Sequence, residues 1–469
     1  MTNFWDFNVW GGFFLIAVLL ISLLLGNILK KQIPFLQESL IPTSVLGGLI
    51  LLIIAEVYRA ITGRGLFDEA LFGGNGYANL EIITYHALAL GFIASSFKTS
   101  DNKMTKERSG EIFNTGVTTV STYLIQAIFG LGIGLIVSLI LTDFLPAAGV
   151  LLPFGYGQGT GQALNYGNIY EVEHGFVGGK SFGLTIAALG FLSAAIGGVI
   201  HLNVLKRRGK IKIVNKSDQT VSHEQVEGEN EIPMQDSIDK MTVQIAFIAV
   251  AYALSFGIMY LLGLLLPGMK ATIFGFNFLL GVLSAMLVKT VINFLKKKGV
   301  VKKHYINNFL MTRASNLCYD IMVVAGIAAI RLSLLKDYWG VILILGVVGL
   351  VITYIYNRIV AKTLFKAYAE EQFMAMYGML TGTASTGIIL LRELDGDFKT
   401  PVADNLVYQN LPAIVFGFPM MLLATLAPKK PILTLIILVA FFAVMNVILF
   451  RKQIFKRKQT AVETTKTEE

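Results

Sequence analysis

The sequence predicts an all-α polytopic membrane protein, and three observations support this fold class. Only 15% of the 469 residues are charged, against about 25% in ordinary soluble domains, and 54% are hydrophobic. Apolar runs of about 20 residues, long enough to cross about 30 Å of hydrocarbon, recur along the whole chain. Basic residues collect after every second run, as in the cytoplasmic loops of membrane proteins. These features exclude a soluble enzyme, a disulfide-rich secreted protein and a disordered chain.

Eleven apolar segments are predicted to span the membrane as helices. The N-terminus carries Asp6 and no Lys or Arg before the first of them, which argues against a cleaved signal peptide. The predicted spans are 10–29, 41–61, 78–97, 113–141, 181–205, 242–266, 273–295, 312–335, 338–360, 404–427 and 430–450.

The basic residues predict the orientation of these spans. Clusters such as Lys30-Lys31 and Lys206-Arg207-Arg208 follow odd-numbered spans only. With the N-terminus outside and the C-terminus cytoplasmic, just eight of the 39 basic residues lie outside: Arg59, Arg64, Lys180, Lys270, Arg331, Lys336, Lys429 and Lys430. This imbalance predicts an N-out, C-in topology, and it accounts for the net charge of +9 without a nucleic-acid partner.

Two further segments, 147–172 and 372–395, are apolar in part but interrupted by Gly, Thr, Ser and Asn. Non-helical backbone at membrane depth persists only where protein or a water-filled cavity satisfies its polar groups. Both segments are therefore predicted to be re-entrant hairpins. The first lies between spans four and five and enters from outside, whereas the second lies between spans nine and ten and enters from inside.

The positions of the hairpins predict two inverted five-helix repeats and one extra C-terminal transmembrane helix. The predicted domains are an N-terminal repeat (1–205), an acidic cytoplasmic linker (206–241), a C-terminal repeat (242–427) and the extra span with a cytoplasmic tail (428–469). Because five is odd, the second repeat starts on the opposite side of the membrane. Inverted halves with interrupted segments at matching places indicate a secondary transporter, although channels also use re-entrant loops.

The centres of the two hairpins carry the candidate substrate-binding residues. Glycine lets a ligand approach the main chain, and the N–H groups of a turn that leads into a half-helix bind anions. Turned carbonyl groups are suitable ligands for Na⁺. Close helix packing by small residues is the alternative explanation for either stretch. The candidates are Gly157, Gln158, Gly159, Thr160, Gly161, Gln162, Thr381, Gly382, Thr383, Ser385 and Thr386.

Asp320 is the clearest carboxylate within a predicted span. A charge at that depth costs at least ~2.5 kcal/mol on insertion scales, so it normally faces a cavity or a partner. Asn316 lies one turn earlier on the same helical face. The two residues are a candidate Na⁺ site, and a structural pairing of Asp320, for example with Arg331, is the alternative.

At these motifs the chain resembles the sodium/glutamate symporter family. Residues 41–48 read IPTSVLGG, similar to the family's Pro-x-x-Val-x-Gly-Gly, and residues 157–161 read GQGTG, similar to its Gly-His-Gly-Thr-Gly. The resemblance covers roughly residues 10–427. Gln158 replaces the histidine that is frequent in the family, the second hairpin lacks the proline of Gly-Ala-Thr-Pro-Thr, and the eleventh span is additional.

The resemblance implies an Na⁺-coupled symporter of glutamate, or of a related small anionic amino acid or carboxylate, without an organic cofactor. It also implies a homodimer in the bacterial inner membrane that moves its substrate by an elevator-like shift. An H⁺-coupled carrier of another organic anion and an ion channel built on re-entrant loops stay open as alternatives. An intramembrane enzyme is disfavoured, since no HExxH or GxSxG motif occurs.

Overall fold

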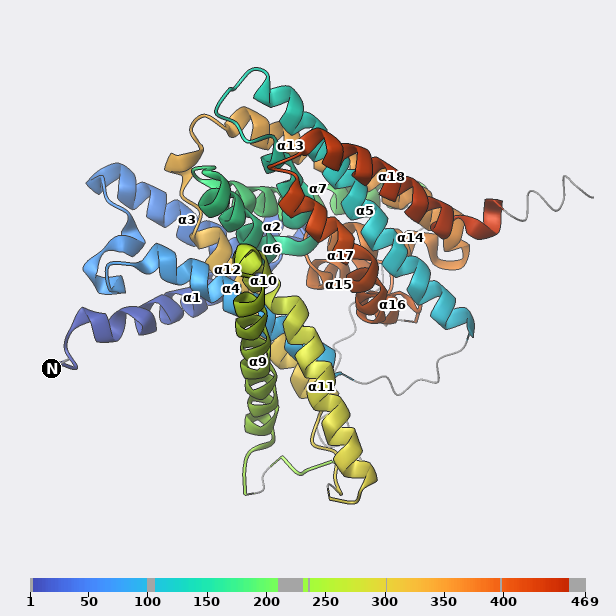
Figure 1. Cartoon of the computed structure of the whole chain (residues 1–469), viewed down its shortest axis with the longest axis horizontal. Coiled ribbons are helices and arrows are strands. Elements are labelled where there is room, and N and C mark those ends of the chain that lie inside the picture. The colour runs from blue at the N-terminus through green and yellow to red at the C-terminus, as the bar shows by residue number, and fades with distance from the viewer. Residues whose placement is uncertain are drawn as a thin grey trace, which may run out of the picture. The chain divides into compact units, whose positions relative to one another are not determined.

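The computed structural model describes residues 3–98, 106–209, 231–234, 237–300, 302–396 and 399–454, which form helices joined by loops (Figure 1). No β-strand occurs within these ranges. The helices are α1 (Phe7–Gln32), α2 (Pro34–Glu38), α3 (Thr43–Thr62), α4 (Gly76–Phe97), α5 (Lys106–Ser138), α6 (Leu151–His174), α7 (Gly179–Arg207), α9 (Lys240–Leu265), α10 (Lys270–Gly275), α11 (Asn277–Lys297), α12 (Asn308–Ala328), α13 (Trp339–Leu364), α14 (Ala369–Thr381), α15 (Ala384–Arg392), α16 (Val402–Tyr408), α17 (Asn410–Leu426) and α18 (Pro431–Leu449).

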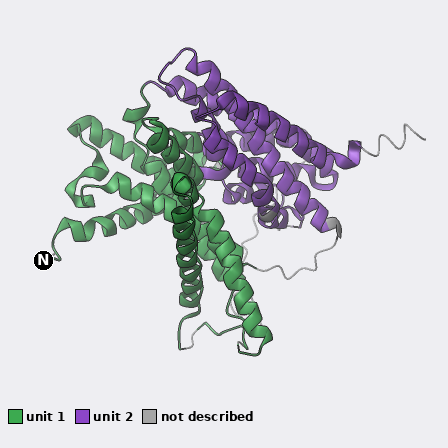
Figure 2. Ribbon diagram, in the orientation of Figure 1, with its two compact units in different colours: residues 1–103, 160–188, 216–336 green, residues 104–159, 189–215, 337–469 purple. Residues whose placement is uncertain are grey.

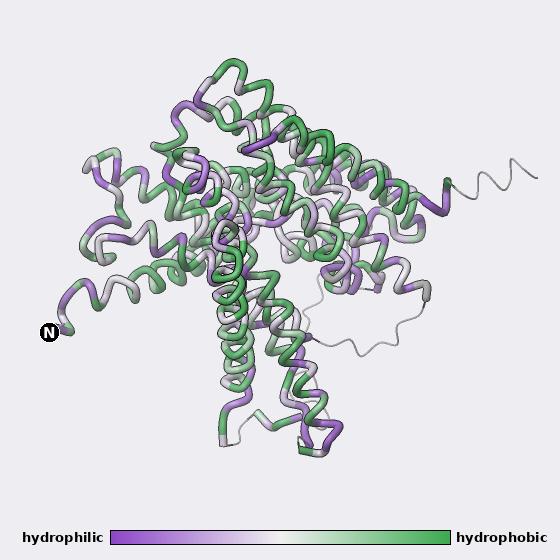
Figure 3. The backbone as a smooth tube through the Cα atoms, viewed as in Figure 1, coloured by the Kyte–Doolittle hydropathy of each residue, from purple (hydrophilic) through white to green (hydrophobic). Residues whose placement is uncertain are grey.

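The length and apolar character of the helices identify a multi-pass membrane protein. Among the described residues, nine helices can cross a membrane, or ten if the bent pair 402–408 and 412–426 forms one span. Figure 3 shows hydrophobic residues running along such helices, for example α9 and α18. The predicted span 404–427 is the bent pair. The predicted span 312–335 is α12, which is less apolar than the nine because it carries Arg313, Asn316 and Asp320.

Local sequence signals set several helix ends. Asp239 begins α9, where its side chain accepts hydrogen bonds from the N–H groups of Met241 and Thr242. Asn307 caps α12 in the same way, through the N–H of Leu310 at 2.9 Å. Gly63 ends α3 with a φ of +74°, a conformation that favours glycine.

Contacts divide the chain into two compact units, which Figure 2 colours separately. Unit 1 comprises residues 1–103, 160–188 and 216–336, and unit 2 comprises residues 104–159, 189–215 and 337–469. Unit 1 therefore holds α1, α3 and α4 together with α9, α11 and α12. Unit 2 holds α5 together with α13 to α18. Each unit takes equivalent spans from both proposed repeats, so the compact units interleave the two halves of the sequence.

Helix packing within unit 1 follows the order of the proposed repeats. The third span, α4, packs against the eighth, α12. The pair α1–α3 has a counterpart in α9–α11, and the pair α4–α11 has a counterpart in α12–α3. Exchanging spans one to three for spans six to eight therefore maps α4–α12 onto itself and each of the other pairs onto its counterpart. This pattern is expected if the two sets of spans are structural repeats.

The acidic linker reaches unit 1 through a buried ion pair. Its predicted carboxylates Glu224, Glu227, Glu229 and Asp236 lie outside the described residues, as does the tail after residue 454. Nζ of Lys240, a residue with 0% exposure, lies 2.6 Å from Oε2 of Glu231. Asn307 donates to the same oxygen at 2.7 Å. The described end of the linker is thus fixed beside the start of α12.

Candidate functional site

The first predicted hairpin coincides with a helix that is broken at a single residue. Helix α6 is helical on both sides of Gly159, whose φ of +76° and ψ of −171° define a conformation open essentially to glycine alone. The break leaves carbonyl groups of the first half and N–H groups of the second half without their intrahelical partners. The boundary between the two units falls between Gly159 and Thr160.

The second half of α6 packs within unit 1. Thr160 is fully buried, and its hydroxyl donates to the carbonyl of Met322 on α12 at 3.2 Å. A Cβ at Gly326 would come within 2.7 Å of the Thr160 side chain, so glycine permits this close approach. Gln162 is also buried, and its Nε2 has no hydrogen-bond partner within the described residues.

The first half of α6 packs within unit 2. The hydroxyl of Tyr123 on α5 donates to the carbonyl of Gly157 at 3.1 Å, and a Cβ at Gly157 would collide with the Tyr123 ring. Nε2 of Gln158 has no hydrogen-bond partner in the described parts of the chain. The substrate-binding candidates of the first hairpin therefore divide, since Gly157, Gln158 and Gly159 belong to unit 2 and Thr160, Gly161 and Gln162 belong to unit 1.

The second predicted hairpin lies wholly in unit 2. Helices α14 and α15 pack against each other, and a Cβ at Gly387 would lie 2.5 Å from the carbonyl oxygen of Ala375. Gly382 and Thr383 form the turn between them. The side chain of Thr383 caps α15 by accepting a hydrogen bond from the N–H of Thr386 at 3.4 Å. The candidates of this hairpin, unlike those of the first, stay together in one unit.

The turn of the second hairpin joins two helix ends of opposite polarity. The carbonyl end of α14 carries a partial negative charge, and the N–H end of α15 carries a partial positive charge. Ala384 is exposed and Ser385 is partly exposed, so the beginning of α15 is open to a ligand. The geometry suits an anion at the start of α15 and a cation at the end of α14.

Gln126 on α5 is a site residue that the sequence analysis did not identify. Its Nε2 donates to the carbonyl of Leu380, near the end of α14, at 3.0 Å. Its Oε1 lies 3.4 Å from the position of a Cβ on Gly157. Gln126 therefore links the two hairpins within unit 2. The sequence shows only a glutamine inside the apolar span predicted for residues 113–141, and no motif marks it as part of a site.

The candidate Na⁺ residues Asp320 and Asn316 lie on α12 in unit 1. Both residues are exposed on the surface of the chain, and the Ser44 side chain on α3 lies beside the Asp320 carboxylate. Arg331 lies 3.7 Å from Glu81 and over a tyrosine ring, so the structure pairs it with these groups. The same helix supplies the Met322 carbonyl that receives Thr160.

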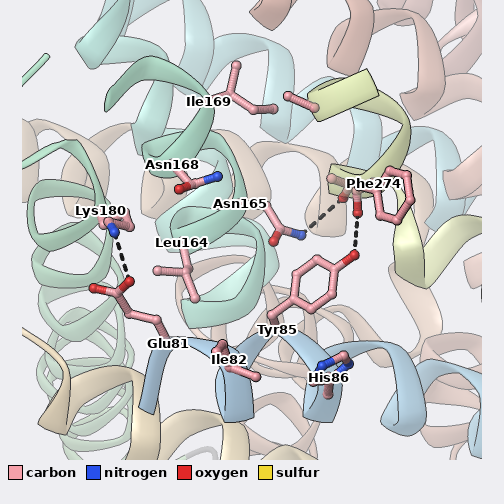
Figure 4. Close-up of a pocket in the computed structure, with 12 residues that line it drawn as sticks. Glu81, Ile82, Tyr85, His86, Leu164, Asn165, Asn168, Ile169, Lys180 and Phe274 are labelled. Atoms are coloured by element: carbon pink, nitrogen blue, oxygen red, sulfur yellow. Dashed lines mark hydrogen bonds and ion pairs between the residues drawn. The ribbon is translucent and has the colours of Figure 1, made fainter. Parts of the chain in front are cut away.

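A cavity of about 460 Å³ opens beside the second half of α6, as Figure 4 shows. Asn165 and Tyr85 line it and donate to the carbonyl groups of Gly275 and Phe274, at 3.0 and 2.8 Å. Lys180 also lines it and lies 2.8 Å from a carboxylate oxygen of Glu81. The cavity combines an apolar wall with one ion pair, and it adjoins Gln162 through Asn165. None of the predicted site residues lines it directly.

His86, which also lines this cavity, lies within α4. Nδ1 of His86 lies 2.6 Å from the hydroxyl of Tyr252. Glu56 and Arg59, one turn apart on α3, form an ion pair at 2.6 Å. Neither pair requires a catalytic role.

Comparison with known proteins gives one match of wide extent. A family model described as sodium/glutamate symporter matches residues 12–389 of the chain. This range includes the break in α6 and the turn between α14 and α15. No curated protein matches the chain.

Proposed function

Because the chain belongs to the sodium/glutamate symporter family, we propose that it is a secondary active transporter that moves glutamate, or a related small anionic amino acid or carboxylate, together with Na⁺. The family implies Na⁺-coupled glutamate transport rather than catalysis. The observation that carries the proposal is the pair of interrupted helical segments, one broken at Gly159 and the other at Gly382 and Thr383.

The substrate anion binds the N–H ends of the interrupted segments in this proposal. An open helix N-terminus offers unpaired N–H donors and a favourable dipole to a carboxylate. Ser385 and Thr383 add hydroxyl groups at the start of α15. The second half of α6 begins at Thr160 and supplies a further N-terminus of the same kind. Transporters with broken helices bind anionic substrates in this manner.

Asp320 and Asn316 are the proposed Na⁺ ligands that the sequence itself suggests. An intramembrane carboxylate normally marks an ion pathway or a cavity, and the Ser44 hydroxyl provides another oxygen at this place. Replacing Asp320 with Asn is expected to raise the Na⁺ concentration that gives half-maximal uptake. An unchanged Na⁺ titration in a folded Asp320→Asn protein would remove Asp320 from the site.

The proposed mechanism is an elevator-like alternating-access shift that carries bound substrate and Na⁺ across the membrane. Its support is the interleaving of equivalent spans in each unit and the exchange pattern of helix packing in unit 1. We further propose that the two hairpins are re-entrant, that the N-terminus lies outside the plasma membrane, and that the transporter is a homodimer. The charge distribution supports the orientation, and family membership supports the dimer.

Uptake of labelled glutamate into proteoliposomes tests the proposed function. The expected result is saturable uptake that requires an inward Na⁺ gradient, together with counterflow when the vesicles are preloaded with unlabelled glutamate. Uptake driven by a proton gradient without Na⁺ would instead support an H⁺-coupled carrier. Flux that neither saturates nor shows counterflow would support a channel.

A further inference from the structure

Four uncharged side chains form a cluster between α5 and α13 in unit 2. Thr122 and Gln126 lie one turn apart on α5, and Thr353 and Asn357 lie one turn apart on α13. Gln126 Nε2 donates to the Thr353 hydroxyl at 2.8 Å, and Asn357 Nδ2 donates to the Thr122 hydroxyl at 3.4 Å. Each amide thus reaches the threonine of the other helix. Because α5 and α13 are the fourth and ninth predicted spans, the cluster has the exchange symmetry of inverted halves.

Both amide oxygens of this cluster are buried without a donor. Gln126 and Asn357 are 0% and 1% exposed, and neither Gln126 Oε1 nor Asn357 Oδ1 has a hydrogen-bond partner in the described part of the chain. A buried polar atom that is left unsatisfied costs about 1–3 kcal/mol. Two such oxygens in one cluster therefore indicate that a ligand able to bind oxygen lone pairs, such as a cation, occupies this place.

Two carbonyl ends of helices meet the same cluster. Gln126 bonds the Leu380 carbonyl near the end of α14, and its Oε1 faces Gly157 near the end of the first half of α6. The C-terminal end of a helix carries a partial negative charge that favours a cation. In transporters with discontinuous helices, such ends and unwound carbonyl groups coordinate Na⁺.

We propose that this cluster, which we call the amide cluster (Thr122, Gln126, Thr353 and Asn357), binds Na⁺ with the Leu380 carbonyl, independently of Asp320. The oxygen donors are two amides, two hydroxyls and one main-chain carbonyl, all uncharged. A site without carboxylates favours a monovalent cation, since divalent ions are held largely by carboxylates. The choice of Na⁺ among small monovalent cations rests on the proposed function.

Thermal unfolding of the purified full-length protein tests this site without any substrate. Melting temperature is measured while NaCl replaces choline chloride at constant ionic strength. A ligand that binds only the folded state stabilises it by mass action, so the expected result is a saturable, Na⁺-specific rise. Thr353→Val and Asn357→Leu are each expected to raise the half-saturating Na⁺ concentration at least about tenfold. Even substitutions of residues that only support a metal ligand lower metal affinity by about 10- to 100-fold.

Thr363→Val is the matched control on the same helix. Among the described residues, the Thr363 hydroxyl bonds only the carbonyl of Ile359 on its own helix, at 2.7 Å. The Na⁺ titration of Thr363→Val is therefore expected to match that of the unmodified protein. Asn357→Asp covers the case in which the apolar variants do not fold. This isosteric change adds a negative charge, and it is expected to lower the half-saturating Na⁺ concentration.

Two results would overturn the amide cluster as a cation site. One is the absence of any Na⁺-specific stabilisation, which would leave water as the partner of the two oxygens. The other is an unaltered half-saturating Na⁺ concentration in all folded cluster variants. Since the assay needs no glutamate, failure of glutamate uptake does not affect its outcome. Conversely, Na⁺-driven uptake with the same Na⁺ dependence in Thr353→Val would refute the site and leave the proposed function intact.

Discussion

The break in α6 and the turn between α14 and α15 use the same residue types but are stabilised differently. The α6 break depends on one glycine in a conformation that other residues avoid, and Thr160 beside it is fully buried against α12. The turn in the second hairpin has no positive φ among its residues, and Thr383 caps the helix that follows. Ala384 beside that turn is exposed.

The first break therefore depends on the conformation of the backbone, whereas the second depends on a side-chain hydrogen bond. At Gly159 the backbone conformation itself disfavours a Cβ, and both Gly159 and Thr160 are buried. At Gly382 and Thr383 the chain reverses with negative φ angles of −149° and −139°, and the Thr383 hydroxyl caps the next helix. The first break should therefore tolerate substitution least, and the second should respond to the loss of specific hydrogen bonds.

The largest effect is expected for Gly159→Ala. An Ala in this backbone region is strained by about 1–3 kcal/mol, and the fully buried surroundings of Thr160 restrict relaxation. Uptake is expected to fall to background while the protein still elutes as a folded species in size-exclusion chromatography. Uptake near the unmodified rate would show that this break is not part of the transport site.

Thr160→Val is expected to have the next largest effect. The substitution keeps the shape of the side chain but removes the hydrogen bond to the Met322 carbonyl, which contributes about 0.5–1.5 kcal/mol. Melting temperature and uptake should both fall. Thr160→Ser retains the hydroxyl and serves as the control, so equal losses in the two variants would point to packing rather than to the hydrogen bond.

Thr383→Val tests the cap of the second hairpin. Loss of an N-cap hydroxyl costs typically ~1 kcal/mol, and it also removes a proposed ligand of the substrate. The expected result is a rise of about fivefold in KM for glutamate, the equivalent of that free energy, with a smaller change in kcat. Thr383→Ser should restore KM, and a Thr383→Val protein with unaltered KM would place the anion elsewhere.

Gly382→Ala is expected to have the smallest effect of the series. A Cβ here would lie 2.9 Å from the Thr386 hydroxyl, 3.0 Å from the Phe191 ring and 3.2 Å from the Gly378 carbonyl oxygen, and none of these contacts involves a positive φ. Uptake should therefore fall less than in Gly159→Ala, whereas the bulky Gly382→Leu should abolish it. Equal loss of uptake in the two alanine variants would remove the distinction between the breaks.

The positions of both interruptions could be predicted from the sequence because their signals are local. Runs of Gly and Thr inside apolar segments marked Gly159 and Gly382, and nine of the eleven predicted spans agree with helices that can cross a membrane. Hydrophobic length also revealed α12, although Asp320 and Asn316 lower its apolar character. Each of these features lies within one continuous segment, where composition determines the outcome.

The partners of these segments could not be predicted, because they come from distant parts of the chain. Gln126 and Leu380 are 254 positions apart, and Thr160 and Met322 are 162 positions apart. An isolated amide or threonine in a span has many possible partners, and only the folded arrangement selects one. The cavity between α4, α6 and α10 and the assignment of the α6 halves to different units have the same origin.

Binding of glutamate to the purified protein at several Na⁺ concentrations tests the central claim, the coupling of substrate and ion, most directly. Thermodynamic linkage requires that a coupling ion raise substrate affinity and that the substrate raise ion affinity by the same factor. We expect the Kd for glutamate to fall as Na⁺ replaces choline, and the Na⁺ affinity to rise equally with glutamate. A glutamate Kd that is the same without Na⁺ and at saturating Na⁺ would contradict the account.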